Sequence, residues 1–101
     1  MKSLMQKDKG FCYLCKLLNG DDFPKQTQEH HVCFGTANRK QSERFGLKVY
    51  LCLNHHEIGP EAVHNNHTNA RILQREAQKV FEANFPDKSF IEVFGRNYKE
   101  E

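Results

Sequence analysis

Residues 51–56 read Leu-Cys-Leu-Asn-His-His, and residues 12–15 read Cys-Tyr-Leu-Cys. Each stretch is a knuckle in which two potential zinc ligands are separated by two residues, so that one tight turn aims both side chains at a single point. Together the knuckles offer three thiolates and one imidazole, a full tetrahedral set for a closed structural site. We therefore predict a zinc-stabilised fold whose structural Zn²⁺ is bound by Cys12, Cys15, Cys52 and His55.

Cys33 is the remaining thiol, and it could replace His55 as the fourth ligand. It lies between apolar Val32 and Phe34 and has no partner at knuckle spacing, so we interpret it as a packed thiol. Paired cysteines beside histidines, with no hydrophobic signal core before them, favour metal binding over a secreted disulfide scaffold. We expect reduced thiols in a soluble, cytoplasmic protein.

Length and composition fit one compact domain. The chain has 101 residues, of which 38% are hydrophobic, and a formal net charge of +2. This mild charge neither requires nor excludes a nucleic-acid partner, and no apolar run approaches the roughly 18 residues of a membrane span. We predict a flexible N-terminal lead-in over residues 1–10 and a single domain over residues 11–101.

The apolar pattern predicts an α+β fold. Alternation indicates two short strands, over 30–34 and 47–53, which could pair as an antiparallel ββ hairpin. Between them, residues 39–45 favour a short helix or turn that ends at Gly46, and residues 12–29 read as irregular.

The clearest helix is predicted over residues 69–84, with Thr68 as its N-cap. Its apolar residues fall on one face, at positions Ala70, Leu73, Ala77, Val80 and Phe81. Pro86 ends it, and residues 90–94 form a last apolar segment before Gly95. The expected architecture is therefore a hairpin, a crossing metal-bearing segment and one long C-terminal helix.

All six histidines lie between positions 30 and 67, and four of them form the adjacent pairs 30–31 and 55–56. Because one tetrahedral zinc takes only four ligands, this clustering indicates a second metal environment. Its candidate members are His30, His31, His56 and, after the Gly59-Pro60 break, His64. We interpret His67 as part of the polar surface at a helix start.

The order Glu29-His30-His31-Val32, then Gly35, then residues 51–56, resembles the HNH endonuclease signature with its zinc knuckles. Within that superfamily the chain is most similar to small HNH proteins of bacteriophages and prophages, over about residues 11–66. Residues 42–47, 63–66 and 94–98 also look like family features. The resemblance implies a ββα-metal (His-Me finger) domain that cleaves or nicks DNA with a divalent metal. It further implies a role in phage replication, recombination or packaging, in the cytoplasm of a bacterial host.

The resemblance also implies a role for each histidine. His30 and His56 would bind the catalytic ion, which could be Mg²⁺, Mn²⁺, Ni²⁺ or Zn²⁺, and His31 would be the general base. Neighbours on a strand point to opposite sides, which lets one imidazole hold metal while the next accepts a proton. The third metal ligand stays open, with His64 as the candidate.

HNH sites usually contain an asparagine that orients the base, a few residues before the Leu-Cys of the second strand. This chain has Leu47 and Lys48 there. Asn38 is our preferred substitute, and Asn65 or Asn66 could serve instead.

DNA contacts are expected near the base strand, where Arg39 and Lys40 follow it and are joined by Arg44 and Lys48. A row of basic residues on the long helix, at 71, 75 and 79, reads as an ordinary solvated face. The alternative function is a noncatalytic HNH-like zinc module that binds DNA or a phage or host protein.

Overall fold

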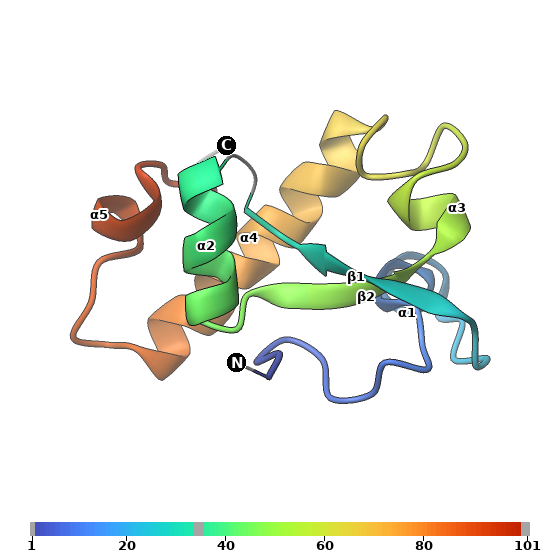
Figure 1. The fold of residues 1–101 in the computed structure, drawn as a ribbon, viewed down its shortest axis with the longest axis horizontal. Helices are drawn as coiled ribbons and strands as arrows, with labels where there is room; N and C mark the ends of the chain where they lie inside the picture. Colours follow the sequence, from blue (N-terminus) through green and yellow to red (C-terminus); the bar gives the residue numbers. More distant parts are fainter. Residues whose placement is uncertain (1, 34–35, 100–101) are drawn as a thin grey trace.

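The computed structural model of the protein describes residues 2–33 and 36–99. In chain order its elements are α1 (Tyr13–Asn19), β1 (Thr27–His31), α2 (Thr36–Arg44), β2 (Lys48–Cys52), α3 (Leu53–His56), α4 (His67–Asn84) and α5 (Phe90–Phe94). The expected α+β composition is confirmed: a two-stranded sheet is surrounded by helices (Figure 1). Within the described part of the chain, no helix is both long and apolar enough to cross a membrane.

The sheet is antiparallel, with Glu29 opposite Tyr50, His30 opposite Val49 and His31 opposite Lys48. The second predicted strand is confirmed, whereas β1 begins and ends about three residues earlier than the predicted strand over 30–34. Phe34 and Gly35 lie outside the described residues. The strands are joined through α2 rather than by a tight turn, and α2 begins at Thr36, before the predicted start.

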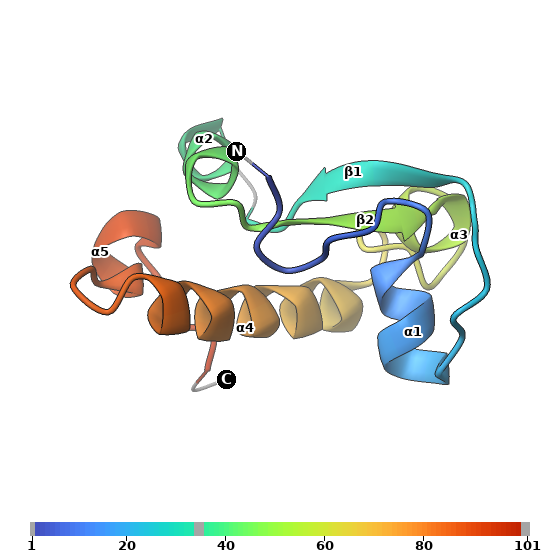
Figure 2. The same ribbon diagram turned by 90° about the horizontal axis from the view of Figure 1, so that it is seen from below.

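The prediction of an irregular segment over residues 12–29 was wrong, because it contains α1. Cys12 caps this helix, since its sulfur accepts from the Cys15 amide at 3.4 Å, and Gly20 ends it. The knuckle spacing is therefore built on a helical turn. Helix α1 packs beside the end of β2, below the sheet in Figure 2.

Helix α4 covers one face of the sheet in both views (Figures 1 and 2). Its fully buried Leu73, Ala77 and Phe81 join β2 residues Val49 and Leu51 in one core. The 3.6-residue period thus identified the buried face correctly. The N-cap is Asn66, whose side chain accepts from the Asn69 amide at 3.0 Å, and not the expected Thr68.

The C-terminal apolar segment folds into α5 and packs against the far end of α4. Phe90 and Phe94 have ring centroids 4.6 Å apart, and Phe81 contacts both. Phe45, from the end of α2, lies 5.1 Å from Phe81. This aromatic group fixes α2, α4 and α5 at the end of the molecule away from the knuckles.

The N-terminal segment lies along β2, where the sequence predicted only a flexible lead-in. The Leu4 amide donates to the Gly46 carbonyl, and the Tyr50 amide donates to the Gln6 side chain, both at 2.8 Å. Gly46 has a φ of 71°, and a Cβ there would lie 2.6 Å from the Lys2 carbonyl oxygen. Glycine is required both by this backbone conformation and by this close approach.

Candidate metal centres and active site

The two knuckles converge on one point, as predicted. The sulfurs of Cys12, Cys15 and Cys52 lie 3.5, 3.4 and 3.4 Å from Nδ1 of His55, and the Cys15 and Cys52 sulfurs are 3.8 Å apart. Around a tetrahedral zinc, with Zn–S of about 2.3 Å and Zn–N of about 2.0 Å, sulfurs are about 3.8 Å apart and lie about 3.5 Å from nitrogen. The four side chains therefore have the chemistry and the spacing to hold a structural zinc ion.

The local folding of each knuckle explains this convergence. Cys12 and Cys15 occupy the N-cap and first turn of α1, while Cys52 ends β2 and His55 lies one turn later in α3. Burial, followed by hydrogen bonding to Cys12, raises the pKa of Cys15 to about 12 when no cation is present. A bound zinc ion reverses that preference by stabilising thiolates, so metal binding and folding of this corner are coupled.

Cys33 stays outside this cluster, as predicted. It is fully buried, its amide donates to the Ser42 hydroxyl at 3.0 Å, and burial raises the pKa of its thiol to about 12. A thiol in this state is inert packing rather than a ligand.

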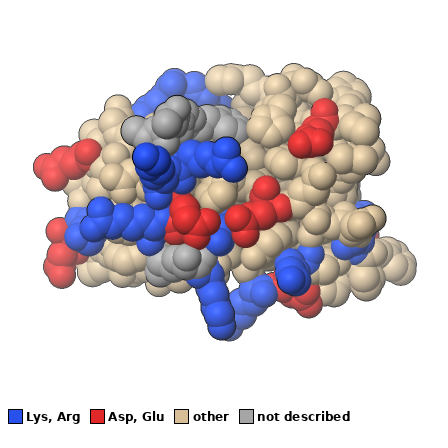
Figure 3. Space-filling view, viewed as in Figure 1, with Lys and Arg blue, Asp and Glu red and all other residues tan. Residues whose placement is uncertain are grey.

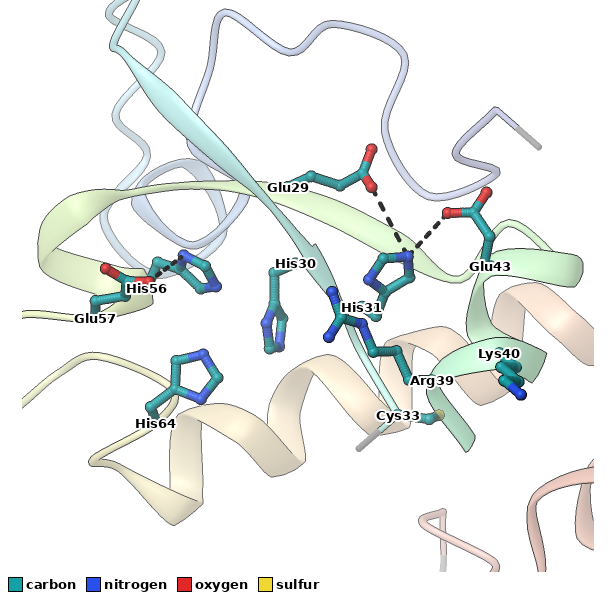
Figure 4. A pocket seen from close by; sticks show the side chains of 10 residues that line it. All are labelled: Glu29, His30, His31, Cys33, Arg39, Lys40, Glu43, His56, Glu57 and His64. Carbon is teal, nitrogen blue, oxygen red and sulfur yellow. Dashed lines mark hydrogen bonds and ion pairs between the residues drawn. The ribbon is translucent and has the colours of Figure 1, made fainter. Parts of the chain in front are cut away.

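A second cluster is formed by His30, His56 and His64, the trio named as catalytic metal ligands. One ring nitrogen from each lies within 4.8 Å of the others, and the ring centroids are 5.0 to 5.4 Å apart. Figure 4 shows the three rings converging from β1, α3 and the loop before α4. The loop returns over the site because the Val63 amide donates to the His55 carbonyl at 2.8 Å.

The surroundings of His30 and His56 favour neutral imidazoles, the form that binds metal. Burial, followed by repulsion from His56 and His64, lowers the pKa of His30 to about 3. Burial, followed by repulsion from His64, also lowers the pKa of His56. The Gln28 side-chain oxygen lies 2.7 Å from His56 Nδ1 and can accept its proton, which leaves Nε2 to the cluster. Three imidazole donors that line a cavity differ from the closed set of four donors at the knuckles.

The His31 side chain points to the side of β1 opposite His30, where acidic side chains lie beside it. Its Nε2 lies 2.9 Å from a Glu43 oxygen and 3.8 Å from a Glu29 oxygen. Lys48, which is buried, lies 3.0 Å from Glu43 and 3.5 Å from Glu29. Lys48 was expected among the DNA contacts, but it is buried and pairs with the two carboxylates instead. Glu43 and Glu29 were not identified as site residues from the sequence, and only the i,i+2 spacing of Glu29 and His31 along a strand hinted at one of them.

The side chain that hydrogen-bonds His31 in this structure is Glu43, and the orienting role predicted for Asn38 stays a prediction. Asn38 lies in the first turns of α2, and no hydrogen bond joins it to His31 among those of the described residues. Asn65 donates to the carbonyls of Glu57 and Gly59, and Asn66 caps α4. The length of α2 brings its last turn, with Glu43, beside the start of β2.

One cavity of about 910 Å³ connects both sides of β1. It is lined by the three clustered histidines, by His31 with its two carboxylates, and by the predicted DNA contacts Arg39 and Lys40. Basic side chains gather over α2 beside acidic ones in Figure 3. In Figure 4, Arg39 extends toward His30 and His31, whereas the amine of Lys40 points away from them. His67 is not part of this lining and accepts instead from Arg71 Nε at 3.0 Å.

The cavity therefore combines three imidazoles that could hold a metal ion, a histidine hydrogen-bonded to a carboxylate, and cationic side chains. Comparison of the chain with protein-family models, with curated proteins and with solved structures gave no match.

Proposed function

We propose that this protein is a divalent-metal-dependent endonuclease or nickase of the HNH type that hydrolyses phosphodiester bonds in DNA. The observation that carries the proposal is the placement of His31 in the same cavity as the His30, His56 and His64 cluster. A proton acceptor and a metal site facing one space are what hydrolysis of a phosphate diester needs. A structural zinc ion bound by the knuckles would have the separate role of holding α1 and α3 in place.

The residues divide the reaction between them. His31 takes a proton from water, the water oxygen bonds to phosphorus, and the bond to the leaving oxygen breaks as that oxygen gains a proton from solvent. A divalent ion held by His30, His56 and His64 would supply Lewis-acid stabilisation of the charge that develops on the phosphate oxygens. Arg39, which extends into the cavity, is placed to pair with a phosphate.

The proposal is tested by nicking of supercoiled plasmid with Mg²⁺, Mn²⁺ or Ni²⁺. We expect cleavage by the parent protein and a loss of about 10²- to 10⁴-fold in rate for His31→Ala, which removes the base. Raising the metal concentration should not restore that variant. His67→Ala is the matched control, since it removes an imidazole that does not line the cavity.

Metal-free reactions need care because a strong chelator can strip the knuckle zinc as well. The control is therefore protein dialysed against buffer without added metal, with zinc content and the circular dichroism spectrum measured afterwards. A folded, zinc-containing protein that fails to cut DNA with any of the three metals would favour the noncatalytic binding module. Equal cleavage by parent protein and His31→Ala would show that His31 is not the base.

A further inference from the structure

The side of β1 that carries His31 holds a connected group of four charged or titratable side chains. Glu29 and His31 share this side because residues two apart on a strand point the same way. Lys48 lies directly across the sheet from His31, and Glu43 arrives from the last turn of α2. The strand register and the length of α2 thus bring together residues from three elements.

This group also has the spacing of a cation site, since Glu29, His31 and Glu43 place potential ligand atoms within 4.8 Å of one another. However, the ammonium of Lys48 already lies between the two carboxylates, and Lys48 is only 7% exposed. A buried ammonium needs these carboxylates as partners, and a metal ion would have to displace it. The group is therefore better explained as a fixed hydrogen-bond network than as another metal site.

We propose that Glu43 is the positioning residue of His31, in the role that an asparagine has in the HNH proteins this chain resembles. The Glu43 carboxylate accepts a hydrogen bond from His31 Nε2–H over 2.9 Å. This contact sets the rotation of the ring and assigns the proton to Nε2, which leaves the Nδ1 lone pair to accept a proton from water. The inference rests on the proposed function, because positioning has catalytic meaning only if His31 is the base.

Lys48 fixes Glu43 in turn. Its Nζ donates to both carboxylate oxygens of Glu43, at 3.1 and 3.0 Å. The Glu43 side chain is 41% exposed and without such contacts would sample several rotamers in solvent. A buried cation in the sheet thus helps to hold this carboxylate against the histidine, and the order Lys48, Glu43, His31 runs from the core to the cavity.

The test compares Glu43→Ala with Glu43→Gln in two measurements. We expect Glu43→Ala to lower kcat by about 10- to 100-fold with little change in KM, as is typical when an outer partner of a site residue is lost. Glu43→Gln should recover part of that loss, because its amide oxygen still accepts from Nε2–H. Glu76→Ala is the control, since it removes a carboxylate that pairs with Lys79 on α4 and does not line the cavity.

The second measurement needs no turnover. In ¹⁵N-histidine-labelled, zinc-containing protein, the His31 Nε2–H should be protected from exchange and give an NMR cross-peak that His31→Asn removes. That peak should vanish in Glu43→Ala and persist in Glu43→Gln. A peak unaffected by Glu43→Ala would overturn the contact, and a lost peak with an unchanged kcat would overturn the positioning role while leaving the nuclease proposal intact. If the parent protein cleaves no DNA, the proposed function fails, and a peak that still depends on Glu43 then reports a purely structural contact.

Discussion

The two candidate metal clusters share a pair of adjacent residues, His55 and His56, and yet have opposite characters. The knuckle cluster has four donors, all buried, and none of them lines the cavity. The histidine cluster has three donors, and all of them line it. His55 and His56 belong to different clusters because successive residues of a helix point about 100° apart. A closed set of four suits a structural ion, and an open set of three leaves room for water and substrate.

The positions of the histidine ligands also depend on the knuckle cluster, whereas the knuckle cluster does not depend on them. The knuckle cluster fixes α3 through Cys52 and His55, and the carbonyl of His55 anchors Val63, the neighbour of His64. Two of the three members of the histidine cluster therefore rely on the knuckle for their positions. We expect loss of the knuckle to destroy both sites, and loss of the histidine cluster to leave the fold intact.

The largest effect should come from Cys52→Ala. Binding free energy at structural zinc sites is about 10–16 kcal/mol in small zinc domains, more than the whole stability of a typical domain. We expect this variant to lose stoichiometric zinc, cooperative thermal unfolding and binding of the second metal together. Elemental analysis measures the zinc content, and a circular dichroism melt measures the unfolding. Titration calorimetry measures binding of the second metal.

Cys33→Ala is the matched control for Cys52→Ala, because it also removes a buried thiol but one outside the cluster. It should keep its zinc and lose only about 1 kcal/mol of stability, as for other small deletions in a core. If both variants melted alike and kept the same metal content, the knuckle would have no structural role.

An intermediate effect is expected from His64→Ala, which removes one of three donors from the open cluster. Losing a ligand should weaken Mn²⁺ or Ni²⁺ binding by about 100-fold or more, since even outer partners contribute about 10- to 100-fold. The melting transition and knuckle zinc should stay unchanged. Titration calorimetry measures the affinity, and cleavage should recover at high metal concentration, unlike that of His31→Ala.

The control for this experiment is His67→Ala, three residues further along the chain. The His67 imidazole lies at the start of α4. The metal affinity of the His67→Ala protein should match that of the parent protein. A His64→Ala protein that binds the second metal as tightly as the parent would show that His64 is only a neighbour of that site.

The smallest effect should be at the rim of the cavity, with Arg39→Ala. Removing one phosphate contact should weaken binding to all DNA sequences alike and reduce the slope of log K against log salt by about 1. Fluorescence anisotropy over a range of salt concentrations, in a His31→Ala background that preserves the DNA, measures this slope. Lys79→Ala, on the exposed side of α4, is the control and should leave the slope unchanged. Equal slopes for His31→Ala alone and for the same protein with Arg39→Ala or Lys79→Ala would show that DNA does not contact Arg39.

The parts of the molecule that the sequence determined by itself are those fixed by local spacing. Knuckle ligands with two residues between them share one turn, so Cys12 with Cys15 and Cys52 with His55 could be paired without a structure. The buried face of α4 followed from its 3.6-residue period in the same way. Helix α1 was missed because its 7 residues span too few turns to show a period, and its cap is a cysteine rather than a typical capping residue.

The tertiary structure alone decided which distant residues face the cavity. The return of His64 depends on one backbone hydrogen bond to α3, and the meeting of Glu43, His31 and Lys48 depends on strand register and on the length of α2. None of these contacts leaves a spacing signal in the chain, so Asn38 was chosen to stand in for the missing asparagine, whereas the structure places Glu43 beside His31. The physical reason is that a ligand pair within one turn is set by backbone geometry, whereas a pair across elements is set by packing of the whole core.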